Sequence, residues 1–310
     1  MQLVTGKKKP LVKRFAHAFR QDVGAWVLML PSLILFIFFV WQPLVNGLIL
    51  SLFETKGFDP VRFIGLQNFI DVVQESSFRA AVINTFKYTL WSLVLGFPLP
   101  ILTAVMLNEV KRFKAFFRFT VYFPSIVPGV AAAILWSLIY HPTSGLLNSL
   151  LSVFGVDAIP WLQNQNLVIP CIVIMMTWKG FGSTAILYLA SLQGVNQELY
   201  EAAMIDGCGP FRIFWNILLP LLRPILGVVA LFQFRHTWND YITSSVFTMT
   251  QPDLRPLTVG VVQLKYGASA AAEWNLMMAG AAISIIPMLL VYFVCNKYFM
   301  NSVTEGSVKG

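Results

Sequence analysis

The most restrictive feature of this sequence is a run of 31 residues without a charge, at positions 23–53. A helix needs about 20 consecutive apolar residues to cross the roughly 30 Å of hydrocarbon in a bilayer, so this run is long enough to span a membrane. Basic residues precede it, but the run is too long for the apolar region of a cleavable signal peptide. Over all 310 residues, 57% are hydrophobic, 12% are charged and the mean hydropathy is +0.69. These values predict an integral membrane protein.

Five further apolar runs are also long enough to cross a bilayer. With the first, they predict six transmembrane helices at residues 23–53, 88–108, 119–140, 167–193, about 218–243 and 274–296. An even number of spans places both termini on the same side. The expected fold is therefore an all-α polytopic membrane protein, with a basic arm at 1–22, a transmembrane domain at 23–300 and a tail at 301–310.

The distribution of lysine and arginine indicates which side the termini occupy. Of the 22 such residues, 14 lie in the arm, the second and fourth loops and the tail, five lie in the opposite loops, and three lie within spans. By the positive-inside rule, both termini are expected to be cytoplasmic. This asymmetry explains most of the net charge of +8, so the charge does not indicate nucleic-acid binding.

Proline and glycine interrupt several of the predicted spans, as at Pro98, Pro128 and Gly182. A proline removes a backbone donor, and the freed carbonyl must then face a neighbouring helix or water. Broken helices fit a transporter core better than a simple anchor. The three cysteines are far apart and form no Cys/His cluster, so neither a disulfide framework nor a metal site is predicted.

A polar segment, ELYEAAMIDGCGPFRIFWNILLP, lies between the fourth and fifth predicted spans. Asn196 can cap a helix whose first turn carries Glu198, where an acid is favourable. This helix is expected to end at Gly207, and Pro210 suits the first position of a second helix. On periodicity alone, the segment is an amphipathic loop on the cytoplasmic surface.

The spacing within this segment resembles the E-A-A-x3-G-x9-I-x-L-P signature of bacterial ABC-importer permeases. The matching residues are Glu201, Ala202, Ala203, Gly207, Ile217, Leu219 and Pro220. Other stretches resemble carbohydrate permeases of the maltose-transporter type, namely RFIGLQNF, NTFKYT, FFRFTVYFP, LYLASLQGV and the terminal GSVKG. The CGP turn at residues 208–210 departs from the family pattern, in which the first residue is more commonly Ala.

The resemblance implies the type I ABC importer fold, with a cytoplasmic coupling helix in a loop at about 194–222. It implies a bacterial cytoplasmic-membrane complex of two permeases, a cytoplasmic ATPase dimer and an extracytoplasmic solute-binding protein, which together import a sugar or oligosaccharide. The coupling helix would sit in a cleft of the ATPase. Glu201 would meet a basic group there, Ala202 and Ala203 would permit close packing, and Gly207 would permit the turn; Asp206 shares a helical face with both alanines.

The chain contains no G-x-x-x-x-G-K-[ST] motif that could cradle nucleotide phosphates. We therefore expect it to be a transport subunit rather than an enzyme and to bind no cofactor, with ATP and Mg held by the partner ATPase. The resemblance also implies that Lys309 reaches into the ATPase dimer. The alternative is that the tail is a flexible cationic end.

Charges inside spans suggest where the solute passes, because a charge in the bilayer is costly unless it faces a partner or a watery cavity. The candidate pathway residues are Lys87, Trp178, Lys179, Arg235, Trp238, Asn239, Asp240 and Tyr241. A structural alternative is that Lys87 extends to the interface and that Asp240 pairs with Lys179 or Arg235. The predicted spans contain three cations and one anion. This excess of positive charge suggests an acidic saccharide or a glycerol phosphate ester as the alternative to a neutral sugar.

Other function classes fit less well. An ion-coupled secondary carrier also needs broken helices and buried charges, but it predicts repeated halves, and the sequence shows no clear internal repeat. A membrane enzyme needs a catalytic constellation, whereas the three histidines are scattered and no H-E-x-x-H motif or serine elbow is present. A purely structural or signalling subunit is the third alternative.

Overall fold

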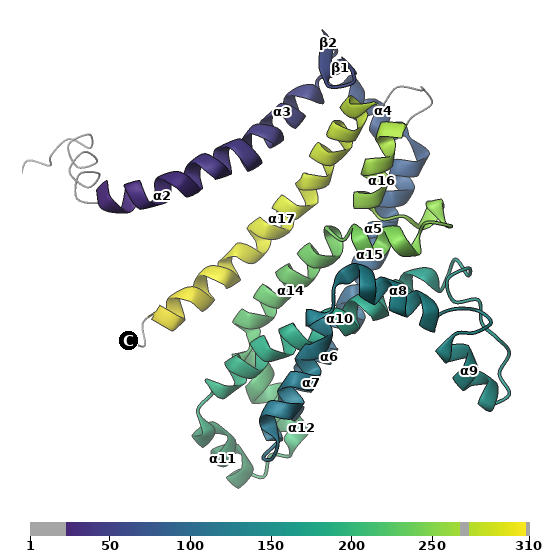
Figure 1. Ribbon diagram of the computed structural model, residues 1–310. Coiled ribbons are helices and arrows are strands. Elements are labelled where there is room, and N and C mark those ends of the chain that lie inside the picture. The colour runs from purple at the N-terminus through teal and green to yellow at the C-terminus, as the bar shows by residue number, and fades with distance from the viewer. Residues whose placement is uncertain (1–22, 267–272, 308–310) are drawn as a thin grey trace, which may run out of the picture.

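The computed structural model of this chain describes residues 23–266 and 273–307. This part of the chain is mostly helical, with one two-stranded sheet (Figure 1). By length and composition, four helical segments within it can cross a membrane: Val23–Leu50, Ser76–Glu109, Val168–Gln193 and Trp274–Cys295. Two bent helix pairs also qualify if each pair is one span, which raises the number to six. The predicted all-α polytopic membrane fold is confirmed.

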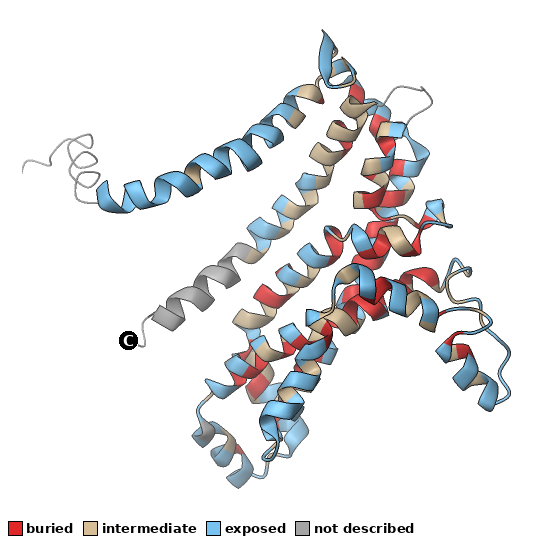
Figure 2. Cartoon of the chain, in the orientation of Figure 1, coloured by how far each residue is buried: buried red, intermediate tan, exposed pale blue. Residues whose placement is uncertain are grey.

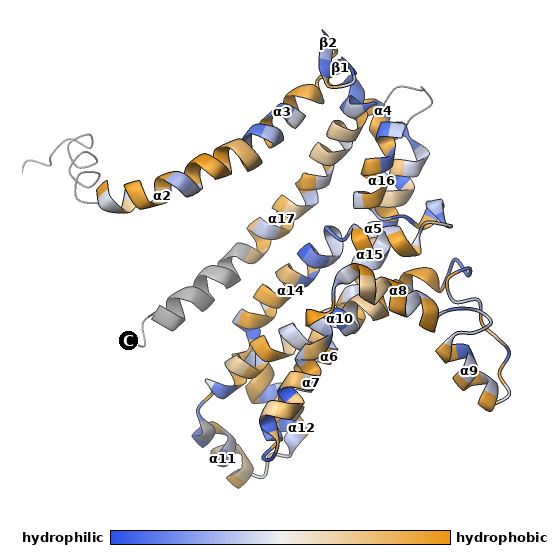
Figure 3. Ribbon diagram, viewed as in Figure 1, coloured by the Kyte–Doolittle hydropathy of each residue, from blue (hydrophilic) through white to orange (hydrophobic). Residues whose placement is uncertain are grey.

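The first span consists of α2 (Val23–Phe36), a π-helical turn (Ile37–Trp41) and α3 (Gln42–Leu50). It contains no buried residue and extends away from the body of the molecule, with α3 packing on α17 (Trp274–Ser307). Figures 2 and 3 show that this span is exposed and mostly hydrophobic. A helix that is apolar and exposed all round requires lipid or another protein to cover it.

A small hairpin follows the first span, formed by β1 (Phe53–Lys56) and β2 (Asp59–Phe63). The next helix is α4 (Gln67–Gln74), which contains the buried Asn68. The Nδ2 atom of Asn68 donates hydrogen bonds to the carbonyls of Ser51 and Phe53, at 2.8 and 2.9 Å, and so connects α4 to the start of the hairpin. The hairpin lies at the opposite end of the molecule from α11 (Gln197–Ile205), the helix of the polar segment (Figure 1).

The second span is formed by α5 (Ser76–Gly96) and α6 (Pro98–Glu109). Its helix begins at Ser76, twelve residues before the predicted start at 88. The prediction was wrong there because it stopped at the charged Lys87, whereas a helix can continue through charged residues. Lys87 consequently lies in the middle of α5.

Two predicted spans are broken. The third bends by 95° between α7 (Lys114–Ile126) and α8 (Gly129–Ile139), where Val127, before Pro128, is extended at ψ 129°. The fifth bends by 74° between the segment Pro210–Leu221 and α14 (Arg223–Trp238). The segment Pro210–Leu221 contains α12 (Pro210–Ile213), a π-helical turn (Phe214–Leu218) and α13 (Leu219–Leu221). The prediction that the fifth helix continues to residue 243 was wrong, because α14 ends at Trp238 and a separate helix, α15 (Ile242–Phe247), follows.

The centre of the fold is α10 (Val168–Gln193), which matches the predicted fourth span to within one residue. It packs against α5, α6, α7, α8, α14 and α15, and half of its most apolar window is buried. Figure 2 shows buried residues concentrated around it. Tyr88, Tyr140 and Ile172 are among the largest fully buried side chains. The helix α10 therefore holds the broken spans together.

The remaining elements are short, except for the last helix. They are α9 (Leu146–Val153), α11 (Gln197–Ile205), the 3₁₀ turns Pro252–Leu254 and Leu264–Tyr266, and α16 (Leu257–Gln263). The last helix, α17, continues past the predicted span end at 296 through Ser307, into the expected tail. Lys309 and the predicted basic arm, 1–22, lie outside the described residues.

Candidate functional site

The polar segment after α10 folds as the sequence predicts at its amino end. The Oδ1 atom of Asn196 accepts a hydrogen bond from the Glu198 N–H at 3.0 Å, which caps α11. The acid also lies in the first turn, where it interacts favourably with the helix dipole.

The other end of α11 closes in a glycine turn. Gly207 has φ +78°, a left-handed conformation that disfavours residues with a Cβ. Its N–H donates to the Met204 carbonyl at 3.1 Å, and the Cys208 N–H donates to the Ala203 carbonyl at 2.9 Å. This pair of bonds is a Schellman motif. Pro210 follows at the start of α12, so two short helices joined by a glycine turn are present.

The predicted coupling residues divide by exposure. Glu201, Ala202 and Asp206 are exposed on α11, whereas Ala203 is only 7% exposed and packs with Leu192 and other residues of the chain's own core. The small side chain of Ala203 thus serves packing within this chain. The other predicted residues, Ile217, Leu219 and Pro220, are half-buried in the segment that leads to α14.

A cavity of about 370 Å³ lies between α11 and the end of α6. Both Glu109 and Glu201 line it, together with Tyr200. The hydroxyl of Tyr200 is buried and has no hydrogen-bond partner within the described part of the chain. Burial, and secondarily Glu109, raises the pKa of Tyr200 above its ordinary value. The cavity therefore offers carboxylate oxygens to a basic group.

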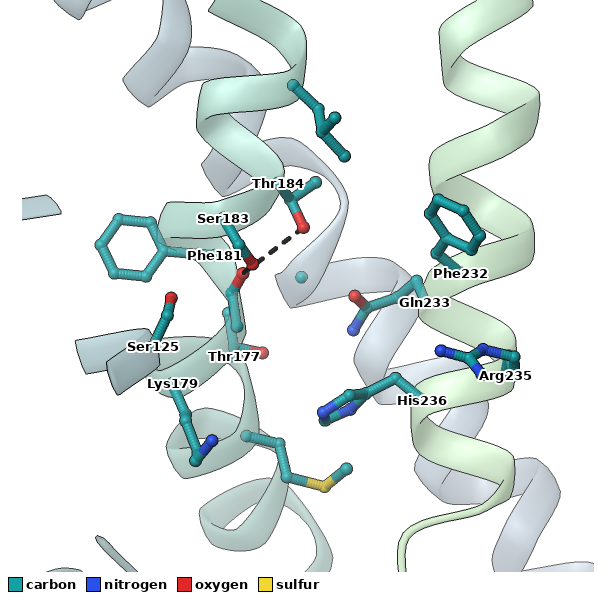
Figure 4. A pocket seen from close by; sticks show the side chains of 14 residues that line it. Ser125, Thr177, Lys179, Phe181, Ser183, Thr184, Phe232, Gln233, Arg235 and His236 are labelled. Carbon is teal, nitrogen blue, oxygen red and sulfur yellow. Dashed lines mark hydrogen bonds between the residues drawn. The ribbon is translucent and has the colours of Figure 1, made fainter. Parts of the chain in front are cut away.

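A second cavity, of about 300 Å³, lies against the middle of α10 and faces α14. We call it the membrane cavity. Its lining residues are Gly96, Ser125, Met176, Thr177, Lys179, Gly180, Phe181, Ser183, Thr184, Leu187, Phe232, Gln233, Arg235 and His236. Figure 4 shows Gln233 and His236 reaching from α14 towards α10, which carries Thr177 and Lys179. The volume lies at the lower end of the range for small-molecule sites, about 300–1,000 Å³.

Of the eight predicted pathway residues, Lys179 and Arg235 line the membrane cavity. Trp178 instead packs against Trp136 at a ring-centroid distance of 5.7 Å. Trp238 is 2% exposed, stacks on Phe234 at 5.1 Å, and its Nε1–H donates to the Ser284 carbonyl. Both tryptophans therefore contribute to packing in this conformation.

The remaining four predicted residues also lie outside the membrane cavity. Asp240 Oδ2 accepts hydrogen bonds from the N–H and the hydroxyl of Ser244, at 2.8 and 2.7 Å, and so satisfies one backbone donor in the first turn of α15. No ion pair joins Asp240 to Lys179 or Arg235, all three of which are described, so the structural alternative of such a pair is not found. The three exposed residues are Lys87, Asn239 and Tyr241.

Sequence reasoning missed several polar residues of the membrane cavity. Gln233 Nε2 and Thr237 Oγ1 both donate to Ser92 Oγ on α5. Within the described residues, Ser125 Oγ and Thr177 Oγ1 are buried without hydrogen-bond partners. Polar residues one helical turn apart within an apolar span, such as Gln233 and Thr237, were the available signal.

The family model described as "Binding-protein-dependent transport system inner membrane component" matches residues 96–305. The chain is 28% identical over 294 residues to the arabinooligosaccharides transport permease AraP of Bacillus subtilis, covering 94% of this chain and 91% of that protein. It is 30% identical over 274 residues to the trehalose/maltose permease MalF of Thermococcus litoralis, covering 88% and 91%.

A third relative is the polygalacturonan/rhamnogalacturonan permease YteP of Bacillus subtilis, 30% identical over 304 residues, with coverage of 94% and 93%. Among solved structures, the fold is similar to that of a chain in a bacterial ABC transporter involved in the import of the acidic polysaccharide alginate. The TM-score is 0.76 at 24% identity, and the match covers 92% of this chain and 97% of that chain.

Proposed function

Since the chain belongs to the family of binding-protein-dependent transport system inner membrane components, we propose that it is a permease subunit of an ATP-driven importer for a sugar or oligosaccharide. The names of three relatives that align with most of the chain support a saccharide as the solute. The chain is a non-enzymatic membrane subunit, and ATP and Mg bind a separate ATPase. Its other partners are a second permease and an extracytoplasmic solute-binding protein.

The observation that carries the solute proposal is the membrane cavity. Its lining combines cationic side chains, hydroxyls and an amide with apolar residues such as Phe181 and Phe232, in the middle of a membrane-spanning helix. Saccharides present both hydroxyl groups and apolar ring faces, which such a lining can bind. The hydroxyls of Ser125 and Thr177, which have no partner among the described residues, further favour a polar occupant, because a buried polar group without a partner is costly.

The loop at 194–222 is the proposed coupling element. A partner that moves α11 would also move α10 and α12, because Ala203 shares a packed cluster with Leu192 of α10 and Ile213 of α12. The polypeptide continues from α12 to α14, which carries part of the membrane cavity. Rigid packing of this kind converts a push on a surface helix into movement of spans. The cavity with Glu109 and Glu201 accepts a basic group of the ATPase.

We place α11 and both termini on the cytoplasmic side of a bacterial cytoplasmic membrane, from the lysine and arginine distribution. Lys309 is proposed to contact the ATPase dimer. Deletion of residues 306–310 should lower the ATPase activity that depends on solute and binding protein. Unchanged coupling would favour a merely flexible tail.

The proposed function is tested by reconstitution in vesicles with the partner permease and solute-binding protein. Uptake of radiolabelled arabinotriose, trehalose and trigalacturonate is measured with and without the ATPase subunit and ATP. Uptake that requires both supports the proposal. Uptake driven by a proton or sodium gradient alone would instead indicate a secondary carrier.

A further inference from the structure

The lining of the membrane cavity is unbalanced in charge. Lys179 from α10 and Arg235 from α14 both line it, His236 lies beside Arg235, and none of the 14 lining residues is Asp or Glu. Asp240, the carboxylate that follows α14, accepts two hydrogen bonds from Ser244 and makes no ion pair with either cation. The positive charges in this chain are therefore not neutralised from within the cavity.

Such an arrangement is expensive in a membrane unless something compensates for it. Arg235 and His236 are exposed on this chain and Lys179 is half-buried, so these cations are not enclosed in the chain's own core. Within a bilayer, a cation is costly unless it faces a partner or water. A carboxylate on the solute would provide the counter-charge at the moment of passage. The guanidinium of Arg235 can bind it with two parallel hydrogen bonds, the ammonium of Lys179 supplies up to three donors, and the imidazole of His236 can supply another.

The polar side chains around these cations suit the rest of a sugar acid. Gln233 lines the cavity while its Nε2 is held by Ser92, which leaves its amide oxygen as an acceptor. Phe181 and Phe232 provide apolar surface for a pyranose ring. Inorganic phosphate can accept hydrogen bonds from the hydroxyls of the cavity, but it leaves the apolar surface of the two phenylalanines without contact.

We propose that the membrane cavity is a subsite for the carboxylate of a uronate residue, so that the solute is an acidic saccharide. This rests on the proposed function as a saccharide permease and specifies its substrate class. The cations then act as selectivity residues: they favour the uronate over a neutral sugar of the same shape.

The test compares two trisaccharides that differ only in charge, trigalacturonate and its fully methyl-esterified form. ATP-dependent uptake of each is measured in vesicles that contain the complete reconstituted transporter. The quantity of interest is the acid-to-ester uptake ratio, compared between wild type and variants with the same solute-binding protein, so that the preference of that protein cancels. The variants are Lys179→Gln, Arg235→Gln and the double variant.

We expect the double variant to lower the acid-to-ester ratio at least tenfold, which corresponds to about 1.4 kcal/mol. Lys114→Gln is the matched control. It removes the same charge from the start of α7 but lies outside the cavity, so it should leave the ratio unchanged. Membrane abundance of every variant is measured by immunoblotting.

Three results would overturn the proposal. The first is an unchanged ratio in the double variant at normal abundance. The second is an equal loss of uptake for acid and ester, which would assign the cations a structural role. The third is a fall in the ratio for the control variant as large as that for the double variant. Absence of ATP-dependent uptake for any saccharide would refute the proposed function itself and is therefore distinguishable from these.

Discussion

Gly182 on α10 packs closely against the backbone of α7 beside the membrane cavity. A Cβ placed there would lie 2.0 Å from the Val121 carbonyl oxygen and 3.0 Å from Tyr122 Cα, both on the backbone of α7. Ordinary contact begins at 3.4 Å, so Gly182→Ala must separate the two helices by about 1.4 Å. No side-chain rotation can relieve this clash, because the opposing atoms belong to the main chain. Small residues at such contacts are what lets membrane helices approach closely.

The cost follows from two opposing terms. Overpacking a tight contact typically destabilises by about 1–3 kcal/mol. Replacing glycine by alanine within a helix gains about 1 kcal/mol of helix propensity. Gly180→Ala is the matched control, because it lies on the same helix and its Cβ would meet nothing within 4 Å. Both variants gain the same helix propensity, so the difference between their free energies of unfolding reports the clash alone. We expect Gly182→Ala to be less stable than Gly180→Ala by about 1–3 kcal/mol.

The assay is thermal unfolding of the purified transporter complex in detergent, with ATP-dependent uptake in vesicles as the second readout. Gly182→Ala should unfold at a lower temperature than Gly180→Ala. It should also lose uptake relative to wild type, because α7 carries Ser125 of the membrane cavity one turn beyond Val121. Equal unfolding temperatures for the two variants would refute the close packing of α7 and α10.

Three further predictions concern single polar or backbone features. Ser92→Ala leaves two donors on α14 without their shared acceptor and should destabilise the complex by about 1–3 kcal/mol, measured by the same unfolding assay; unchanged stability would contradict this. Asn196→Ala should cost α11 about 1 kcal/mol of local stability, seen as faster amide hydrogen exchange, whereas Asn196→Asp should retain the cap. Gly207→Ala should cost about 1–2 kcal/mol because φ is +78°, and should lower solute transported per ATP hydrolysed. Gly209→Ala, in an extended conformation, is its control and should couple normally.

Much of the fold could be predicted because hydrocarbon imposes a length and an apolar composition on every span. The fourth span was located to within one residue, and the cap of α11 at Asn196 and the turn at Gly207 were both predicted from residue types alone. These features depend on neighbours within a few positions along the chain. Local rules therefore suffice for them.

The start of α5 and the bend at Pro128 were harder to predict from the sequence. The charge of Lys87 obscured the helix start, because the prediction equated the end of the apolar run with the end of the helix. Proline marked where a break was possible, but the 95° turn there depends on how α7 and α8 pack on the rest of the molecule. The bend of the fifth span before α14 was not predicted for the same reason.

The sequence by itself determined that the chain is a polytopic membrane protein and that a short capped helix with a glycine turn interrupts it. Only the tertiary structure decided which intramembrane side chains share a cavity. Lys179 and Arg235 both line it, whereas Trp178 and Trp238 pack in the core and Asp240 binds Ser244 of α15. The physical reason is that hydropathy and capping act over a single helical turn or span, whereas a cavity is formed by helices that are distant in sequence and pack at angles the sequence pattern does not specify.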